Sequence, residues 1–173
     1  MKRNILLVAI IVFVLTAIVA VMKIQSPTEY YQSVESFMSD AQTVTLSINC
    51  VSVNNNMDKL DKSLIDSGIL PKDGVISTDT AVLVKEEDSV FDVLERYTKQ
   101  SRIQFEFSGE YVKSIYNLRE FSCGPLSGWM FKVNGEFSTL SAKAHKLKAG
   151  DRVEWVYTCD LGRDIGDTYG GER

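Results

Sequence analysis

The chain has 173 residues, a formal net charge of −4 and a single histidine. This length is enough for one domain with its own core. An acidic balance without a dense basic patch argues against nucleic acid and anionic lipid headgroups as partners. One histidine cannot supply a multi-histidine zinc site, and no Cys and His residues stand at metal-ligand spacing, so no metal site is expected.

The amino terminus has the composition of a membrane span. An apolar run over residues 5–22, interrupted only by Thr16, follows Lys2 and Arg3. Such a run can cross a hydrocarbon core of about 30 Å, and the preceding charges place the amino terminus in the cytoplasm and the remainder outside. A cleavable signal has a shorter apolar region and small residues before the cut, where this chain has Ile18. We expect an uncleaved signal anchor over residues 1–23, with a cleaved signal peptide and a secreted protein as the alternative.

The first part of the expected ectodomain combines a stalk, a strand and a long connection. Residues 24–40 are polar with scattered aromatics and predict a stalk. Residues 43–50 alternate between apolar and polar side chains, which is typical of a half-buried strand. Residues 53–77 are rich in Asn, Asp and Gly and predict a long connection with a short helix around residues 59–67.

A second strand is predicted over residues 80–86, and a helix follows within residues 86–101. Ser89 and Asp92 stand at the spacing of a capping box, which marks the start of that helix. Four apolar or aromatic positions then form one helical stripe: Val90, Phe91, Leu94 and Tyr97.

The second half of the chain alternates in four further segments, over residues 102–107, 110–118, 128–137 and 145–158. Asn134-Gly135 is the pair that a two-residue type I′ hairpin turn requires. Alternation gives three sets of residues that each share one face of a strand: Ile103, Phe105 and Phe107; Trp129, Phe131 and Val133; Val153, Trp155 and Tyr157. The pattern predicts an α+β domain over residues 41–166, with an antiparallel or mixed sheet on one main helix as in a β-grasp, and a flexible tail over residues 167–173.

Three cysteines, Cys50, Cys123 and Cys159, allow one disulfide in an oxidising compartment. We expect Cys123 to pair with Cys159, because each flanks one of two strands that are expected to be neighbours. The other two pairings, and three free thiols, stay open.

Two long segments carry a family resemblance: CGPLSGWMFKVNGEF, from Cys123 to Phe137, and HKLKAGDRVEWVYTCDLGRDIG, over residues 145–166. They resemble the bacterial family with domain of unknown function 4430 (DUF4430), also called the transcobalamin-like carboxy-terminal domain. TVTLSINC, NMDKL and VKEEDSVFDVLERY resemble its amino-terminal half, so the resemblance covers most of residues 43–166. It implies a β-grasp-like domain displayed outside bacterial cells and related to the domain that covers one face of the ligand in vertebrate cobalamin carriers. In those carriers a large helical domain covers the other face, and this sequence offers only half of such a pocket.

Loops on a rigid sheet are where binding groups tend to lie. The loops singled out are residues 125–127, 134–137 and 138–145. The candidate ligand-binding residues are Trp129, Phe137, Asn134 and Ser127, although strand alternation alone places Trp129 in the core and turn chemistry alone explains Asn134. His145 is expected to be solvated, and surface charges are expected at Asp160, Asp164 and Asp167.

The resulting hypothesis is a membrane-anchored extracytoplasmic binding module without catalytic activity. By resemblance, its ligand is cobalamin, another corrinoid or a similar flat cofactor, and its partner is a membrane uptake system or a surface protein. The alternative is a protein interaction domain that uses a free sheet edge. A third hypothesis is a sortase-like transpeptidase that uses Cys159, His145 and Arg163. The short spacing from His145 to Cys159 speaks against it, and a bridged Cys159 could not be a nucleophile.

Overall fold

The computed structural model describes residues 42–167, which belong to the second of two compact units of the chain, residues 42–173. The predicted anchor over residues 1–23, the stalk over residues 24–40 and the tail beyond Asp167 lie outside the described residues. Within the described residues, no helix combines the length and apolar character that a membrane crossing needs.

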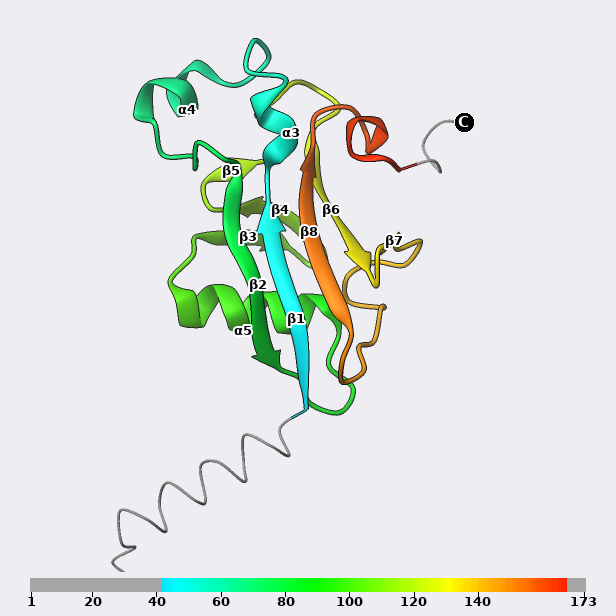
Figure 1. Cartoon of the computed structure of the whole chain (residues 1–173). Helices are drawn as coiled ribbons and strands as arrows, with labels where there is room; N and C mark the ends of the chain where they lie inside the picture. Colours follow the sequence, from blue (N-terminus) through cyan, green and yellow to red (C-terminus); the bar gives the residue numbers. More distant parts are fainter. Residues whose placement is uncertain (1–41, 168–173) are drawn as a thin grey trace, which may run out of the picture. The chain divides into compact units, whose positions relative to one another are not determined.

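The described residues form two sheets (Figure 1). In the larger sheet, β1 pairs in parallel with β8, whereas the other neighbours are antiparallel. Its strands, in spatial order, are β2 (Val75–Leu83), β1 (Thr43–Asn49), β8 (Arg152–Thr158), β6 (Gly128–Val133) and β7 (Glu136–Phe137). The smaller antiparallel sheet consists of β3 (Phe105–Ser108), β4 (Tyr111–Ile115) and β5 (Leu118–Arg119).

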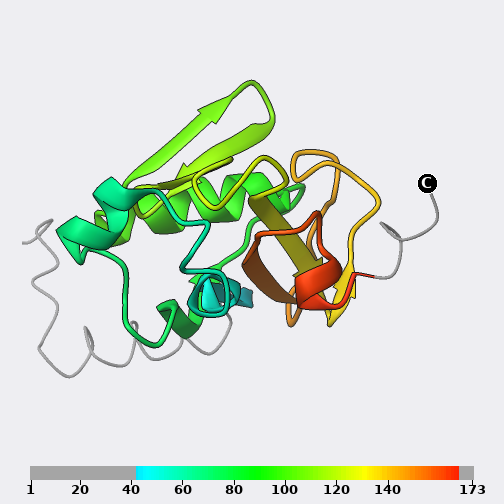
Figure 2. The ribbon, with the colours of Figure 1, turned by 90° about the horizontal axis from the view of Figure 1, so that it is seen from above.

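One long helix, α5 (Val90–Ser101), packs against β2 of the larger sheet and β3 of the smaller one, so it lies between the two sheets (Figure 2). A complete capping box begins it: the Ser89 hydroxyl accepts from the Asp92 amide at 3.2 Å, and the Asp92 carboxylate accepts from the Ser89 amide at 3.0 Å. The short elements are α3 (Val51–Asn54), α4 (Lys62–Ser67) and the 3-10 helix η1 (Arg163–Ile165).

The core lies on the face of the larger sheet that α5 and the smaller sheet cover. Opposite each other on β6 and β8 stand Trp129 and Tyr157, then Phe131 and Trp155. The Trp129 indole N–H donates to the carbonyl oxygen of Leu118 at 2.8 Å, which ties β6 to β5. The largest fully buried side chains include Leu46, Ile48, Leu94, Ile115, Trp155 and Tyr157.

The α+β class with one main helix is confirmed, as is the capped start of α5. Val153, Trp155 and Tyr157 of β8 are buried as one set, but Val156 and Thr158 on its other face are buried as well. The strand predicted over residues 80–86 is wrong in its bounds, because β2 starts at Val75, where it pairs with Asn49 beyond a β-bulge. Polar Ser77, Thr78 and Asp79 hide this pairing from an alternation pattern. The structure also has two sheets where one was expected, and the helical turn α3 was not predicted.

The capping carboxylate makes the stability of the domain depend on pH. Burial alone raises the pKa of Asp92, but hydrogen bonds from Lys143 and Ser89, and the charge of Lys143, lower it to about 2. A carboxylate with a depressed folded-state pKa stabilises the fold above its unfolded pKa, near 4, and this contribution is lost as the pH falls toward 2. We expect Asp92→Asn to lower the free energy of unfolding by about 1 kcal/mol at pH 7 and to leave it nearly unchanged close to pH 2, as measured by urea unfolding across that range.

Asp66→Asn is the matched control, since Asp66 is exposed and forms no ion pair with any described residue. A loss at Asp92 that is constant with pH, or equal to that at Asp66, would contradict this electrostatic explanation.

Candidate binding site

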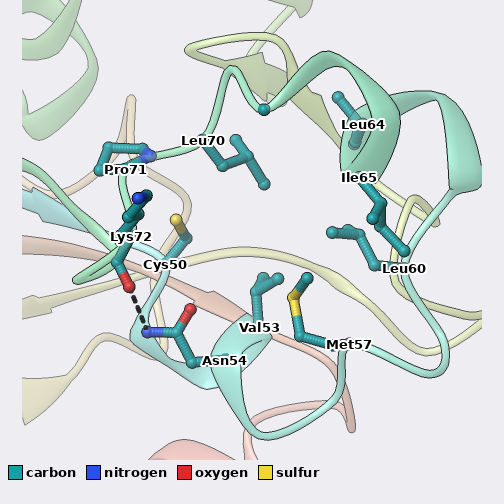
Figure 3. Close-up of a pocket in the computed structure, with 11 residues that line it drawn as sticks. Cys50, Val53, Asn54, Met57, Leu60, Leu64, Ile65, Leu70, Pro71 and Lys72 are labelled. Atoms are coloured by element: carbon teal, nitrogen blue, oxygen red, sulfur yellow. Dashed lines mark hydrogen bonds between the residues drawn. The ribbon is translucent and has the colours of Figure 1, made fainter.

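An apolar cavity of about 330 Å³ lies between α3, α4 and the segment that leads into β2 (Figure 3). The side chains of Val53, Met57, Leu60 and Leu70 point toward its centre. The complete lining is Cys50, Val53, Asn54, Met57, Leu60, Leu64, Ile65, Gly68, Leu70, Pro71 and Lys72. All of these residues come from the one connection between β1 and β2, which was predicted only as a long connection with a short helix.

Backbone contacts hold this connection in place. The Cys50 amide donates to the Gly74 carbonyl oxygen at 2.7 Å, and the Asp61 amide donates to the Ser122 carbonyl oxygen at 2.8 Å. At Gly74, which has a φ of 73°, an added Cβ would lie 2.7 Å from the Cα of Val51. Glycine is therefore needed at position 74 for the two ends of the connection to approach each other.

The wall of the cavity is neutral at physiological pH, and its rim carries a positive charge. Burial, and then the charge of Asp73, raise the pKa of the Cys50 thiol to about 11, so the sulfur stays protonated. Asn54 donates from Nδ2 to the backbone oxygen of Lys72 at 3.3 Å. Among the described residues no carboxylate lies within ion-pair distance of the Lys72 ammonium, which is therefore available to an anionic or polar group of a ligand.

Seven exposed apolar side chains lie on the connections at the edge where β1 and β8 finish, and we call this set the apolar end; two of them, Met57 and Ile65, line the cavity. Two of its members combine high exposure with a positive φ: Phe121 is 60% exposed at φ 67°, and Leu161 is 51% exposed at φ 48°. The Leu161 amide donates to the Leu126 carbonyl oxygen at 2.9 Å, so these two loops touch. Seven of the eleven large exposed apolar residues of the described chain belong to this end: Val51, Met57, Ile65, Ile69, Phe121, Leu126 and Leu161.

The residues predicted to bind a ligand do not line this cavity. Ser127 is buried and accepts from the Cys123 amide at 3.0 Å while donating to the Gly124 carbonyl oxygen at 2.8 Å. Asn134 bonds to the Asp151 carboxylate and the Arg152 amide, both at 2.9 Å, as a turn residue does. Phe137 lies under the Lys132 ammonium, 4.5 Å from its ring centre.

Trp129, the fourth predicted residue, belongs to the core but also lines a second, smaller cavity. A ligand role for any of the four stays a prediction. The signal that could have indicated the cavity between α3 and α4 was present in the sequence as apolar residues without helical or strand periodicity, such as Met57, Ile65 and Leu70.

The other polar candidates are held by protein groups. His145 is partly buried, and its Nδ1 lies 2.8 Å from the Ser138 hydroxyl. Asp164 accepts from the Cys159 amide at 2.8 Å and also bonds Thr158, whereas Asp160 forms an ion pair with Arg163. Among residues 42–167 no group of three or more His, Cys, Asp or Glu side chains could hold a metal ion.

Cys123 and Cys159 are brought together at the apolar end. Both are buried, and their sulfurs lie 2.9 Å apart as free thiols. Burial, and then the neighbouring Cys123, raise the pKa of the Cys159 thiol. A thiol with a raised pKa is a weak nucleophile, and the partners of Cys159 are Cys123 and Ser52, whereas His145 bonds Ser138. This arrangement does not favour the transpeptidase hypothesis.

Comparison with known proteins gives a family match and several structural likenesses, of which two are described. Residues 87–159 match the model of a family described as a domain of unknown function, DUF4430. No curated protein sequence matches the chain. The fold is similar to haptocorrin in complex with Cbi, with a TM-score of 0.48 and 16% identity over 69% of this chain and 25% of that chain. A protein of Ruminococcus gnavus ATCC 29149 that is proposed to bind metal gives a TM-score of 0.37 and 10% identity over 68% and 96% of the two chains. The chain thus spans a quarter of the haptocorrin chain.

The predicted disulfide can be tested by counting thiols. Because the two sulfurs are adjacent, we expect protein from an oxidising compartment to contain a Cys123–Cys159 disulfide and one free thiol, Cys50, when alkylated under denaturing conditions and analysed by mass spectrometry. The bridge would close a loop of 36 residues, which corresponds to about 4 kcal/mol of stabilisation on the chain-entropy model. The double variant Cys123→Ser, Cys159→Ser should have a free energy of unfolding about 4 kcal/mol lower than the bridged protein, measured by urea unfolding. Cys50→Ser should keep the bridge. Three alkylated cysteines in the oxidised protein would contradict the pairing.

Proposed function

We propose that this domain is a non-enzymatic binding module for a flat, amphipathic cofactor of the corrinoid class. Residues 87–159 match the model of the DUF4430 family, as the resemblance predicted. The match is shorter than the predicted range of residues 43–166. We further propose a β-grasp-like topology. Its support is the β1–β2 hairpin, the helix α5 and the parallel return of β8 beside β1.

The apolar end carries this proposal. A cavity of about 330 Å³ is near the lower limit of the roughly 300–1,000 Å³ that enclose drug-sized ligands. A corrinoid is larger than such ligands, so the cavity could take only one apolar group of it, while the exposed side chains of the apolar end support the face of the ring. The opposite face of the ligand would be left open for a partner to cover.

Backbone strain supports a functional role for this end. Bulky residues with a positive φ are disfavoured by roughly 1–2 kcal/mol, and Phe121 and Leu161 have such a φ while their side chains face solvent. Burial therefore does not offset this cost in the unliganded domain. Backbone strain of this kind is concentrated at binding and catalytic sites, where it is part of how the site binds or reacts.

We propose display on the outer side of the cell membrane from the amino-terminal anchor, with transfer of the ligand to a membrane transporter or a surface protein. The basic pair Lys2-Arg3 before the apolar run supports this orientation. Secretion after cleavage is the alternative.

The test is a calorimetric and absorbance titration of the full chain, in a non-ionic detergent, with cobalamin and cobinamide. We expect saturable binding that Phe121→Ala and Ile65→Ala each weaken roughly three- to tenfold, since each removes an apolar contact worth about 1 kcal/mol. Leu140→Ala is the matched control, because Leu140 is 53% exposed but lies outside the apolar end.

The other outcomes separate the alternatives. Loss of binding in Phe137→Ala but not in Phe121→Ala would move the site to the β6–β7 hairpin. Flat titrations with both corrinoids, for a chain whose circular dichroism is that of a folded protein, would reject a corrinoid site on this chain alone.

A second candidate function is protein interaction through a sheet edge. β2, nine residues long, is the outer strand of the larger sheet, with β1 on one side and no strand on the other among the described residues. An exposed edge can accept an added strand. A photo-crosslinking amino acid at exposed Ala81 on β2 should then yield an adduct in intact cells, and the same amino acid at exposed Lys99 on α5 should not. Equal yields at both positions would contradict edge recognition.

A further inference from the structure

The cavity of about 330 Å³ between α3 and α4 has its polar groups on one side. Figure 3 shows Asn54, Lys72 and the thiol of Cys50 on that side, and the aliphatic side chains of Leu60 and Ile65 opposite them. We call the set of Cys50, Asn54 and Lys72 the polar corner. A ligand that fills this cavity therefore needs an aliphatic part and one polar head.

The polar corner contains a hydrogen-bond acceptor that no described residue uses. Asn54 donates from Nδ2 to the backbone oxygen of Lys72 at 3.3 Å, and this bond holds the amide with its Oδ1 directed toward the cavity (Figure 3). Within residues 42–167 no group donates to that oxygen. Because Asn54 is exposed, water can satisfy Oδ1 in the unliganded domain, and a ligand that donates to Oδ1 replaces this water without leaving a polar group unpaired.

The charges around the polar corner favour a neutral head over an anionic one. The Lys72 ammonium has no carboxylate partner in the described part of the chain, so it can donate to a ligand. The next residue, Asp73, lies close enough to act on the Cys50 thiol through its charge, and it offsets the charge of Lys72 at the same place. A carboxylate head would therefore meet two unfavourable neighbours, the Asn54 oxygen and the Asp73 charge.

A primary carboxamide fits these groups. Its nitrogen can donate to Asn54 Oδ1, and its oxygen can accept from the Lys72 ammonium. The cavity volume of about 330 Å³ corresponds to roughly eleven water molecules in the liquid. This volume leaves room for an aliphatic stem of several carbon atoms beside the apolar walls.

We infer that this cavity binds an aliphatic group that ends in a primary carboxamide, with the amide at the polar corner and the stem against Val53, Met57 and Leu60. The inference rests on the proposed function for the source of that group, because corrinoids carry aliphatic side chains that end in amides at the edge of the ring. The domain then distinguishes a corrinoid with intact amides from one whose amides are hydrolysed to acids.

Met57 provides the readout, because it lines the cavity and its side chain points toward the centre. The full chain, labelled at its five methionine methyl groups, is placed in a phospholipid nanodisc so that no detergent chain competes for the cavity. Met57→Leu assigns the signal. Hexanamide should shift the Met57 signal in a saturable manner and leave unmoved that of Met130 on β6, which does not line the cavity. Hexanoate, which has the same stem, should bind roughly tenfold more weakly.

Two variants test the polar corner itself. Asn54→Leu removes the acceptor at a similar side-chain volume and should weaken hexanamide binding roughly tenfold, as the loss of one hydrogen bond does. Lys72→Met removes the donor and should weaken it roughly three- to tenfold. Asn55→Leu is the matched control, because Asn55 is exposed and does not line the cavity, and it should leave the affinity unchanged.

Cobinamide separates this inference from the proposed function. An unmoved Met57 signal at saturating hexanamide, equal binding of hexanoate, or an equal effect of Asn54→Leu and Asn55→Leu would overturn the inference, even where cobinamide binds and the proposed function stands. Saturable hexanamide binding with a flat cobinamide titration would retain the carboxamide site and reject a corrinoid as the source of the amide. Cobinamide binding that Asn54→Leu weakens roughly tenfold, and Asn55→Leu does not, would support both.

Discussion

The parallel pairing of β1 with β8 is the constraint on which the described structure depends. Five residue pairs, from Thr45 with Arg152 to Asn49 with Val156, place the first and last described strands side by side at the centre of the larger sheet. Parallel neighbours cannot be joined by a tight turn, so the hundred or so residues between them must leave the sheet and return. They do so as a hairpin with β2, the helix α5, the smaller sheet and the β6–β7 hairpin.

This pairing also explains why several connections between strands lie at one end of the domain. Parallel strands finish at the same edge, so the helical turn after β1 and the turn after β8 emerge together (Figure 1). β2 and β6 run antiparallel to these strands and therefore begin at that edge, which brings residues 50–74 beside residues 119–127. The Asp61–Ser122 and Leu126–Leu161 backbone hydrogen bonds join these connections. The apolar end is thus a consequence of the topology, built from segments that are distant in sequence.

The core face of β6 and β8 shows two indoles in the same kind of position with different neighbours. Trp129 and Trp155 share one face, in residue pairs that are two apart along the register, and both are buried. Leu118 of the smaller sheet satisfies the indole of Trp129 and so fixes that sheet to β6. No described residue satisfies the indole of Trp155, which lines the cavity between β4 and β8. The strand pattern of the two residues is the same, and only their neighbours distinguish them.

The sequence by itself determined the features that rest on contacts between near residues: the strands β1, β6 and β8, the capping box of Ser89 and Asp92, and the turn at Asn134-Gly135. It also carried the family match over residues 87–159. The tertiary structure alone decided where β2 begins, that β1 runs parallel to β8, and that Phe121 and Leu161 face solvent. A cavity is the space that distant segments leave when they pack, and strand pairing depends on a partner far along the chain. Neither leaves a periodic signal in the residues that form it, because both depend on non-local contacts.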